Sequence, residues 1–505
     1  MLDAPAPALR LHPADSVLIA LADLPAGALA EGVALRDPVP RGHKAALRDI
    51  PQGEAVIRYG QTIGVATRPI RAGEHVHSHN LGMGPHDQDY AFATDIRPLP
   101  LVAPRTFQGY RRADGQSGTR NYLGVLTSVN CSGSVARFIA EACEKEPWLR
   151  DDPSIDGVVP IVHGTGCGMS GRDEGYDTLF RTLQGYARNP NFAGILLVGL
   201  GCEVMQVPDL VGKGRMRGAD LFRYMTIQQT GGTRRTVEKG VAILKEMAEK
   251  AREARREPLP LSGLVVGMQC GGSDGYSGIT ANPALGVASD LLVAHGGTTI
   301  LSETPEIYGA EHLLTRRAVT PEVGAKLVDR IRWWEDYTAR WGGEMDNNPS
   351  PGNKKGGLTT ILEKSLGAVA KGGTAPLSDV VKFAEPLTTR GFVYMDSPGY
   401  DPCSVTGQVA SGANLIVFTT GRGSVSGYKP VPCVKVATNS EMFARMEEDM
   451  DLDAGDIVAR GTPIEEKGEE LLDLMVRTAS GERTKSERQG FGGAEFVPWA
   501  MGAVM

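Results

Sequence analysis

The sequence has no long apolar run: no stretch approaches the roughly 20 residues that a helix needs to span a bilayer. The first residues, Met1 to Pro13, also lack a basic segment followed by an apolar run, so we expect no signal peptide. Seven cysteines in a 505-residue chain without such a signal are typical of reduced thiols, available for metal binding or catalysis. We therefore expect a cytoplasmic protein that does not bind membranes.

The sequence also lacks an excess of positive charge and several common motifs. Its net charge of −7 disfavours nucleic acid as a partner, although a small cationic pocket for a carboxylate substrate remains open. There is no P-loop, and no G-x-G-x-x-G follows a strand with an acidic residue at the required distance, so a nucleotide-dependent enzyme is disfavoured. The cysteines show no C-x-x-C spacing, which argues against a zinc ribbon or a thioredoxin-type site.

Glycine, by contrast, is abundant. The 64 glycines make up about 13% of the chain, against an average of about 7%. Such a surplus is typical of many tight turns and of places where the backbone approaches a ligand closely. The length predicts two or three domains.

The pattern of apolar residues predicts an α/β protein with a small β-rich domain at its N-terminus. Residues 1–83 contain short β-type runs such as Ser16–Ala22, Ala55–Tyr59 and Thr62–Ala66, and residues 84–108, rich in proline, are expected to form a linker. From Tyr122 onward, apolar strands alternate with helical stretches, which is typical of parallel α/β (Rossmann-like) units. Pro258 and Pro260 lie at a plausible boundary, giving a middle domain over 109–258 and a C-terminal domain over 259–505.

Four of the seven cysteines directly follow predicted strands. The strands are 122–127, 157–162, 193–200 and 263–268, and the cysteines are Cys131, Cys167, Cys202 and Cys270. Ligands bind at the carboxyl edge of parallel sheets, so we expect these thiolates to bind iron, zinc or an iron–sulfur cluster. The alternative is that each cysteine is a small buried residue lining a tight turn. Cys143, Cys403 and Cys433 fall outside the pattern and are expected to be structural.

Histidines offer two further candidate sites. His163 shares a loop with Cys167 and is either a catalytic group or a hydrogen-bonded loop residue. His75, His77 and His79, with His86 further on, form a second cluster. Alternate spacing on a strand would place His75, His77 and His79 on one face, where they could bind a metal or transfer protons, or form an exposed polar surface.

Two loops carry cationic side chains suited to an acidic substrate. Arg422, preceded by Thr420 and Gly421, combines a guanidinium with free backbone N–H groups and could bind a carboxylate; a surface ion pair is the alternative. Lys354 and Lys355 lie in a Pro- and Gly-rich loop over 348–357, which could supply a base or a substrate contact, or form a solvated turn.

Six motifs in a fixed order resemble the altronate/galactarate dehydratase family, and the resemblance covers essentially the whole chain. They are Gly118-Thr-Arg-Asn121, Gly199-Leu-Gly-Cys-Glu203, Cys270-Gly-Gly-Ser-Asp274, Gly278-Ile-Thr-Ala-Asn-Pro283, Asn348-Pro-Ser-Pro-Gly-Asn353 and Phe418-Thr-Thr-Gly-Arg-Gly423. The N-terminal zone is similar to the SAF-type domain of that family. The segment 73–80 looks like the altronate branch, whereas 265–270 and 351–357 look more like the galactarate branch.

The resemblance implies a hydro-lyase that removes water from a sugar acid to give a 2-keto-3-deoxy acid, with Fe²⁺ or Mn²⁺ as cofactor. We expect Cys131, Cys167, Cys202 and Cys270 to bind the metal, His163, Lys354 or Lys355 to carry the proton, and the substrate to contact a set of loop residues. That set is Arg422, Thr420, Gly421, Ser273, Asp274 and Asn353. The alternatives are a related sulfo-lyase that expels sulfite and a non-enzymatic sugar-acid binding protein. A homodimer is the default expectation for the assembly.

Overall fold

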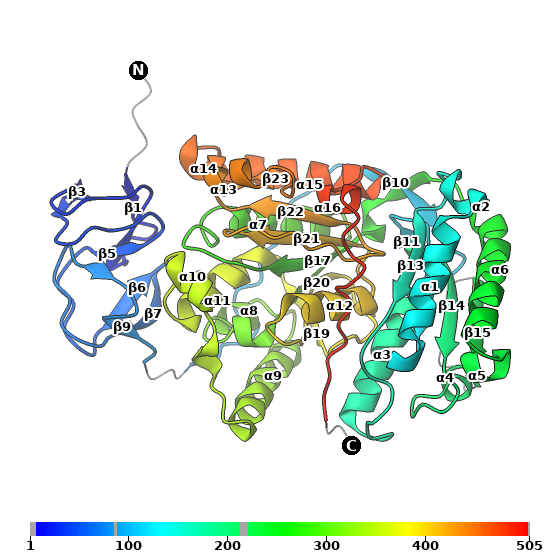
Figure 1. Cartoon of the computed structure of the whole chain (residues 1–505). Coiled ribbons are helices and arrows are strands. Elements are labelled where there is room, and N and C mark those ends of the chain that lie inside the picture. Colours follow the sequence, from blue (N-terminus) through cyan, green and yellow to red (C-terminus); the bar gives the residue numbers. More distant parts are fainter. Residues whose placement is uncertain (1–6, 85–87, 213–220, 503–505) are drawn as a thin grey trace.

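The computed structural model describes residues 7–84, 88–212 and 221–502, so His86 lies outside the described residues. The β-rich N-terminal part and the middle part of the chain lie at opposite ends of the C-terminal part (Figure 1). None of the described helices is both long and apolar enough to cross a membrane.

The N-terminal part consists of short antiparallel strands, as the sequence predicts. One sheet has the order β1-β2-β5-β8 and a second the order β6-β7-β9. The strands are β1 (Ala8–Leu9), β2 (Val17–Ala20), β5 (Lys44–Ala46), β8 (His75–Val76), β6 (Ala55–Arg58), β7 (Gln61–Ala66) and β9 (Leu81–Gly82), with the pair β3 (Leu29–Ala30) and β4 (Val33–Ala34) beside them.

The expectation that His75, His77 and His79 share one face of a strand is wrong. Strand β8 ends at Val76, because the side chain of Asn80 accepts a hydrogen bond from the backbone N–H of His77 (2.9 Å) and turns the chain.

The middle part contains a four-stranded parallel sheet of order β13-β12-β14-β15. Its strands are β12 (Tyr122–Thr127), β13 (Gly157–Ile161), β14 (Phe192–Gly199) and β15 (Leu221–Thr226). Helices α1 (Gly133–Glu144), α3 (Glu174–Arg188) and α6 (Thr233–Ala251) accompany it, each with one apolar side buried. The prolines at the predicted boundary lie in β16 (Glu257–Pro260), which pairs with β10 (Thr106–Arg111).

The C-terminal part is built on a seven-stranded parallel sheet of order β19-β20-β18-β17-β21-β22-β23. Its strands are β17 (Val265–Cys270), β18 (Thr298–Ser302), β19 (Leu377–Val381), β20 (Gly391–Met395), β21 (Leu415–Thr420), β22 (Cys433–Ala437) and β23 (Leu452–Asp453). The longer helices are α7 (Ala281–Ala294), α9 (Pro321–Arg340), α11 (Ile361–Val369), α12 (Asp401–Ser411) and α15 (Ile464–Ala479).

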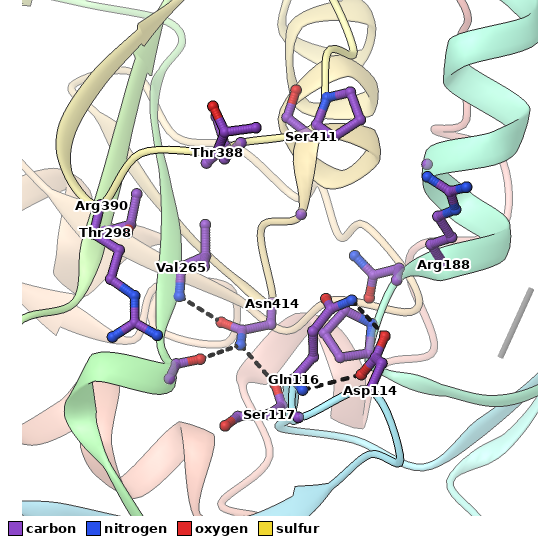
Figure 2. Close-up of a pocket in the computed structure, with 18 of the residues that line it drawn as sticks. Asp114, Gln116, Ser117, Arg188, Val265, Thr298, Thr388, Arg390, Ser411 and Asn414 are labelled. Atoms are coloured by element: carbon purple, nitrogen blue, oxygen red, sulfur yellow. Dashed lines mark hydrogen bonds between the residues drawn. The ribbon is translucent and has the colours of Figure 1, made fainter. Parts of the chain in front are cut away.

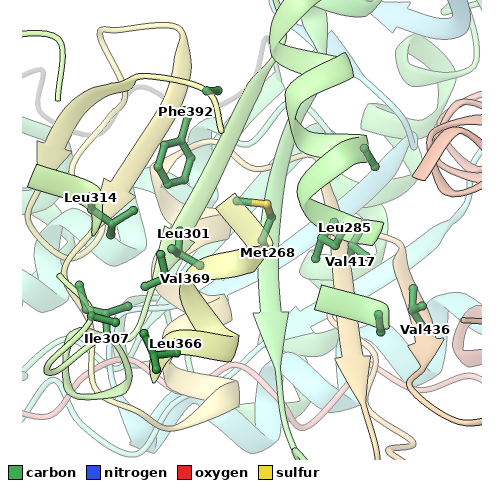
Figure 3. Close-up of a cluster of buried hydrophobic side chains, with 14 of the residues drawn as sticks. Met268, Leu285, Leu301, Ile307, Leu314, Leu366, Val369, Phe392, Val417 and Val436 are labelled. Atoms are coloured by element: carbon green, nitrogen blue, oxygen red, sulfur yellow. The ribbon is translucent and has the colours of Figure 1, made fainter. Parts of the chain in front are cut away.

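Apolar side chains of adjacent strands and helices form the core around this sheet. Met268 of β17, Leu301 of β18 and Val417 of β21 pack with Leu285 of α7 and other buried groups (Figure 3). These strands are buried on both faces, which explains their nearly continuous apolar sequences. The rigid sheet places the loops at its carboxyl edge in fixed positions.

A buried ion cluster joins the N-terminal part to the C-terminal part. Lys44 and Arg58 both contact the carboxylate of Glu363 in α11, at 2.8 Å and 2.5 Å, and all three side chains are at most 2% exposed. The two cations hold the pKa of Glu363 at about 2, although burial alone would raise it. Lys44 also donates a hydrogen bond to the carbonyl of Gly357 (2.6 Å), which holds the N-terminal part against the loop over residues 348–357.

Candidate active site and metal centre

Four polar groups gather behind the carboxyl edge of the C-terminal sheet. Cys270 is the last residue of β17, and Glu303 and Glu306 follow β18 directly. Among the described residues these three form the group whose ligand atoms all lie within 4.8 Å of one another. Asp401, the first residue of α12, lies close enough to influence the charge of both glutamates.

Two lysines neutralise part of this centre. Lys371 Nζ lies 2.9 Å from the sulfur of Cys270, and Lys364 Nζ lies 2.6 Å from a carboxylate oxygen of Glu306. Burial alone would lower the pKa of Lys364 and Lys371, but the nearby negative groups raise the pKa of both. Both lysines therefore stay charged.

Glu303 is the unusual member of the centre. Its side chain is buried, and neither carboxylate oxygen has a hydrogen-bond partner among the described residues. Its backbone adopts φ +74°, a conformation that a non-glycine residue rarely keeps without a functional reason. Burial, reinforced by the charges of Glu306 and Asp401, raises the pKa of Glu303 well above its usual range and that of Asp401 to about 6.

The donor set fits a divalent transition metal. One thiolate and two carboxylates are ligands that iron accepts, and the two free oxygens of Glu303 are acceptors without a partner in the described part of the chain. A divalent cation among these groups would stabilise the ionised carboxylates of Glu303 and Asp401, which burial disfavours.

The four strand-end cysteines do not share one edge, contrary to the expectation from the sequence. Cys131, Cys167 and Cys202 follow β12, β13 and β14 of the middle sheet, whereas Cys270 ends β17 of the C-terminal sheet. Strand-end position identified the residues, but it could not assign their strands to separate sheets.

A cationic cavity of about 160 Å³ lies at Asp274, the last residue of the loop over 270–274 that begins at Cys270. Its lining includes four cations and two carboxylates: Arg41, Lys355, Arg422, Arg445, Asp274 and Glu441. Arg41 comes from the N-terminal part and is held there by Glu441 (2.6 Å) and by the hydroxyl of Tyr276 (3.0 Å). Within the described residues the exposed guanidinium of Arg422 has no ion-pair or hydrogen-bond partner, so it is free to bind an anion.

The structure divides the expected substrate-binding residues into two groups. Arg422, Gly421 and Asp274 line the cationic cavity together with Lys355. The others support the loops behind it: Thr420 accepts a hydrogen bond from the backbone of Gly423 (3.0 Å), and Asn353 donates one to the carbonyl of Ser273 (2.9 Å). Asp274 itself accepts hydrogen bonds from Thr438 and Asn439, which fixes its carboxylate.

A cluster of four imidazoles lies against the same 348–357 loop. His43 joins His75, His77 and His79, with neighbouring ring centroids 4.9–5.6 Å apart. His43 Nε2 bonds the carbonyl of Lys355 and His77 Nε2 that of Lys354, so both nitrogens carry hydrogen. Burial lowers the pKa of His43 and His75 to about 4, which keeps both rings neutral.

His163 lies in the middle part and belongs neither to the lining of the cationic cavity nor to the centre around Cys270. Its Nε2 bonds the carbonyl of Thr127 (3.0 Å), its Nδ1 accepts from the backbone of Thr165 (3.3 Å), and burial lowers its pKa to about 4. Both ring nitrogens are thus engaged in holding the loop that carries Cys167. Lys354 is half-buried, whereas Lys355 is exposed and lines the cationic cavity.

A larger cavity, of about 480 Å³, lies at the opposite edge of the C-terminal sheet (Figure 2). Val265 and Thr298, the first residues of β17 and β18, line it, and Arg188 and Arg390 lie on different sides of it. It is therefore separated from Cys270 by the length of a strand.

Comparison with known protein families identifies the same three parts of the chain. Three family models match in order: "Altronate/galactarate dehydratase SAF domain" over residues 6–84, "D-galactarate dehydratase/Altronate hydrolase, second domain" over 109–252, and "D-galactarate/Altronate dehydratase, C-terminal" over 261–504. The chain belongs to the altronate/galactarate dehydratase family. The resemblance seen in the sequence motifs, and the α/β fold with its N-terminal β-rich SAF domain, are confirmed.

Relatives in this dehydratase family, whose named activities are those of hydro-lyases, match along nearly the whole chain. An altronate dehydratase of Escherichia coli is 40% identical, covering 96% of this chain and 97% of its own. An altronate dehydratase of Bacillus subtilis is 37% identical with the same coverage. A galactarate dehydratase (L-threo-forming) of Escherichia coli is 39% identical, covering 95% and 94%.

Several groups of this candidate site were not predicted from the sequence. Glu303 directly follows β18 and Glu306 lies three residues further on, so the strand-end argument used for the cysteines would have found them. Lys364 and Lys371 do not follow a strand: Lys364 lies within α11, and Lys371 lies in the short turn after it. The strand-end argument therefore could not have found them. Arg41 and His43 join the site only through docking of the SAF domain, which no local pattern reveals.

Proposed function

We propose that this protein is a sugar-acid dehydratase that converts an altronate- or galactarate-type acid to a 2-keto-3-deoxy acid. The observation that carries the proposal is that the 270–274 loop joins a cationic cavity, which Asp274 lines, to a buried centre of one cysteine and two carboxylates, which includes Cys270. A sugar acid needs a cationic group for its carboxylate, and its dehydration needs stabilisation of the charge that develops during elimination.

In this proposal Arg422 binds the substrate carboxylate and Arg41 and Arg445 add to the positive field of the cavity. A base, which we assign to the uncharged form of Lys355, removes the proton from C2; the electron pair forms the C2–C3 double bond, and the C3 hydroxyl takes that proton back from Lys355 and leaves as water. The enol then takes up a proton at C3 and loses the proton of its C2 hydroxyl, which gives the 2-keto group. Asp274 lines both the cationic cavity and a narrow cavity beside Cys270, so the substrate chain is directed along the 270–274 loop.

We assign the metal, Fe²⁺ or Mn²⁺, to Cys270, Glu303 and Glu306. When bound, it would act as a Lewis acid toward a substrate oxygen. Lys364 holds Glu306 and Lys371 holds Cys270, so the ligands are oriented by fixed charged partners.

An anaerobic assay with added Fe²⁺ tests the function. Altronate, galactarate and related hexonates and aldarates are offered side by side, because identities of 39% and 40% do not separate the two branches. We expect a 2-keto-3-deoxy acid from one of them. Binding of a sugar acid without any turnover would contradict the proposal.

Sulfite release is measured in parallel from a sulfonated hydroxy acid. A (2R)-sulfolactate sulfo-lyase subunit beta of Chromohalobacter salexigens is 33% identical to this chain, covering 78% of it and 97% of its own length. Sulfite release in place of dehydration would show that the protein is a sulfo-lyase and would contradict the proposed dehydratase activity.

Replacing Arg422 with Met is expected to lower kcat/KM by about 10- to 100-fold, because a charged hydrogen bond to the substrate carboxylate contributes about 1.5–3 kcal/mol. The matched control is Arg390→Met, in the cavity at the opposite edge of the sheet, which should leave kcat/KM unchanged. Equal effects of the two substitutions would exclude Arg422 as the carboxylate ligand.

A further inference from the structure

The middle domain carries three exposed thiols at one edge of its sheet. Cys131, Cys167 and Cys202 are all exposed, whereas the other four cysteines of the chain are buried. They follow β12 and its two neighbours, β13 and β14, at the carboxyl ends of the strands. Exposed free thiols are prone to oxidation, so three of them on adjacent strands call for a function.

The three loops that carry these cysteines are bound to one another. The backbone N–H of Asn130 donates to the carbonyl of Thr165 (2.9 Å), and that of Met205 donates to the carbonyl of Gly166 (3.2 Å). Gly166 is pressed so closely against the first loop that a Cβ atom there would lie 2.2 Å from the carbonyl oxygen of Ser128. The three loops that carry the cysteines are therefore packed together and held in one arrangement.

Two buried side chains, Glu203 and His163, hold the three cysteine loops in place through hydrogen bonds. Glu203, which follows Cys202, accepts hydrogen bonds from the hydroxyl of Ser128 (2.7 Å) and the backbone of Gly201 (2.6 Å). His163 ties the second loop to the end of β12 through the carbonyl of Thr127. Each cysteine is therefore adjacent to a residue held by a neighbouring loop, so the thiols have a defined arrangement.

The three exposed thiols do not form a ready site for a single ion. In the described parts of the chain, the group that meets the 4.8 Å limit for ligands of one ion is Cys270 with its two glutamates; the three exposed cysteines do not meet it. In a [4Fe–4S] cluster each thiolate binds a different iron, so its thiolates need not lie as close together as the ligands of one metal ion.

We propose that Cys131, Cys167 and Cys202 hold a [4Fe–4S] cluster in the middle domain. Each thiol releases its proton when its sulfur binds an iron, and bridging sulfide completes the cluster, which requires supplied iron and sulfide. The described part of this edge offers no fourth cysteine, so one iron stays open to an oxygen ligand such as a hydroxyl or carboxylate. The proposal does not depend on the proposed function, because Cys270 lies on another sheet.

The test is iron and acid-labile sulfide analysis of the full chain, reconstituted anaerobically with ferrous iron and sulfide. We expect about four of each per chain, with the visible absorption of a thiolate-bound cluster. Cys131→Ser, Cys167→Ser and Cys202→Ser should each lose most of the sulfide and the absorption, with far-UV circular dichroism unchanged since the three side chains are exposed.

Two controls separate this site from the others. Cys143→Ala, a buried thiol of the same domain, and Cys270→Ala, in the C-terminal centre, should retain the sulfide. If the reconstituted protein contained no sulfide, or if the three serine variants kept the full sulfide content, the proposal that these cysteines bind a cluster would be wrong. Loss of turnover in Cys270→Ala with the sulfide retained would leave the cluster intact and bear on the C-terminal metal centre alone.

Discussion

Replacing Glu303 with Gln is expected to abolish metal binding at the C-terminal centre and to lower turnover by at least about 10³-fold. A Lewis-acid metal contributes several kcal/mol to the transition state, and each 1.36 kcal/mol corresponds to a factor of ten in rate. Glu303 supplies the two oxygens that have no partner among the described residues, so its carboxylate is the group most dependent on a cation.

The same substitution should leave the protein as stable as before, or make it more stable. Burial raises the pKa of Glu303, so its ionised form is costly in the absence of a cation, and the neutral amide of Gln removes that cost. The measurements are iron content, kcat and Tm of the iron-free protein. A fall in Tm with iron content unchanged would indicate a structural role and would remove Glu303 from the metal centre.

Replacing Glu363 with Gln is expected to destabilise docking of the SAF domain by about 3–5 kcal/mol, because it leaves the buried cations Lys44 and Arg58 without their carboxylate. Hydrogen exchange over residues 7–84 measures this directly, and exchange there should become faster than in the wild type. Glu238→Gln is the matched control, since its ion pair with Arg234 is exposed on both sides and such pairs contribute about 0–1 kcal/mol.

The Glu363 cluster also predicts a pH dependence. The pKa of Glu363 is about 2 in the folded protein, against 4.5 for an unperturbed glutamate, so its stabilising contribution is complete above pH 4.5 and is lost as the pH falls toward 2. Glu363→Gln should lack this part of the acid dependence. Because Arg41 and His43 reach the site only in the docked domain, the variant should also lose activity although Glu363 contacts no cavity cation. Unchanged exchange over 7–84 would contradict the account.

The sequence predicts the strands well where apolar residues run continuously. Strand β12 has the predicted bounds, and β13, β14 and β17 differ from their predicted bounds by one or two residues. Fully buried parallel strands leave this pattern because both faces are apolar.

The composition of the site is harder to predict, because it depends on which elements meet. Cys270 was found from its strand end, but its partners Glu303 and Lys371 come from a neighbouring strand end and from a turn after α11. The histidine cluster was predicted from the spacing of its members, yet the strand that was to align them ends at Val76, and His43 joins them from the residue just before the paired strand β5. Such long-range contacts leave no periodic signal.

The most direct test of the central claim is the mass of the product formed in D₂O by the iron-loaded enzyme from the sugar acid that it turns over. Dehydration by loss of the C2 proton and the C3 hydroxyl predicts a product lighter than its substrate by one water, carrying one deuterium at C3 at early times. A product that keeps all its oxygen atoms, or one formed without deuterium at C3, would contradict elimination and with it the assignment of this site.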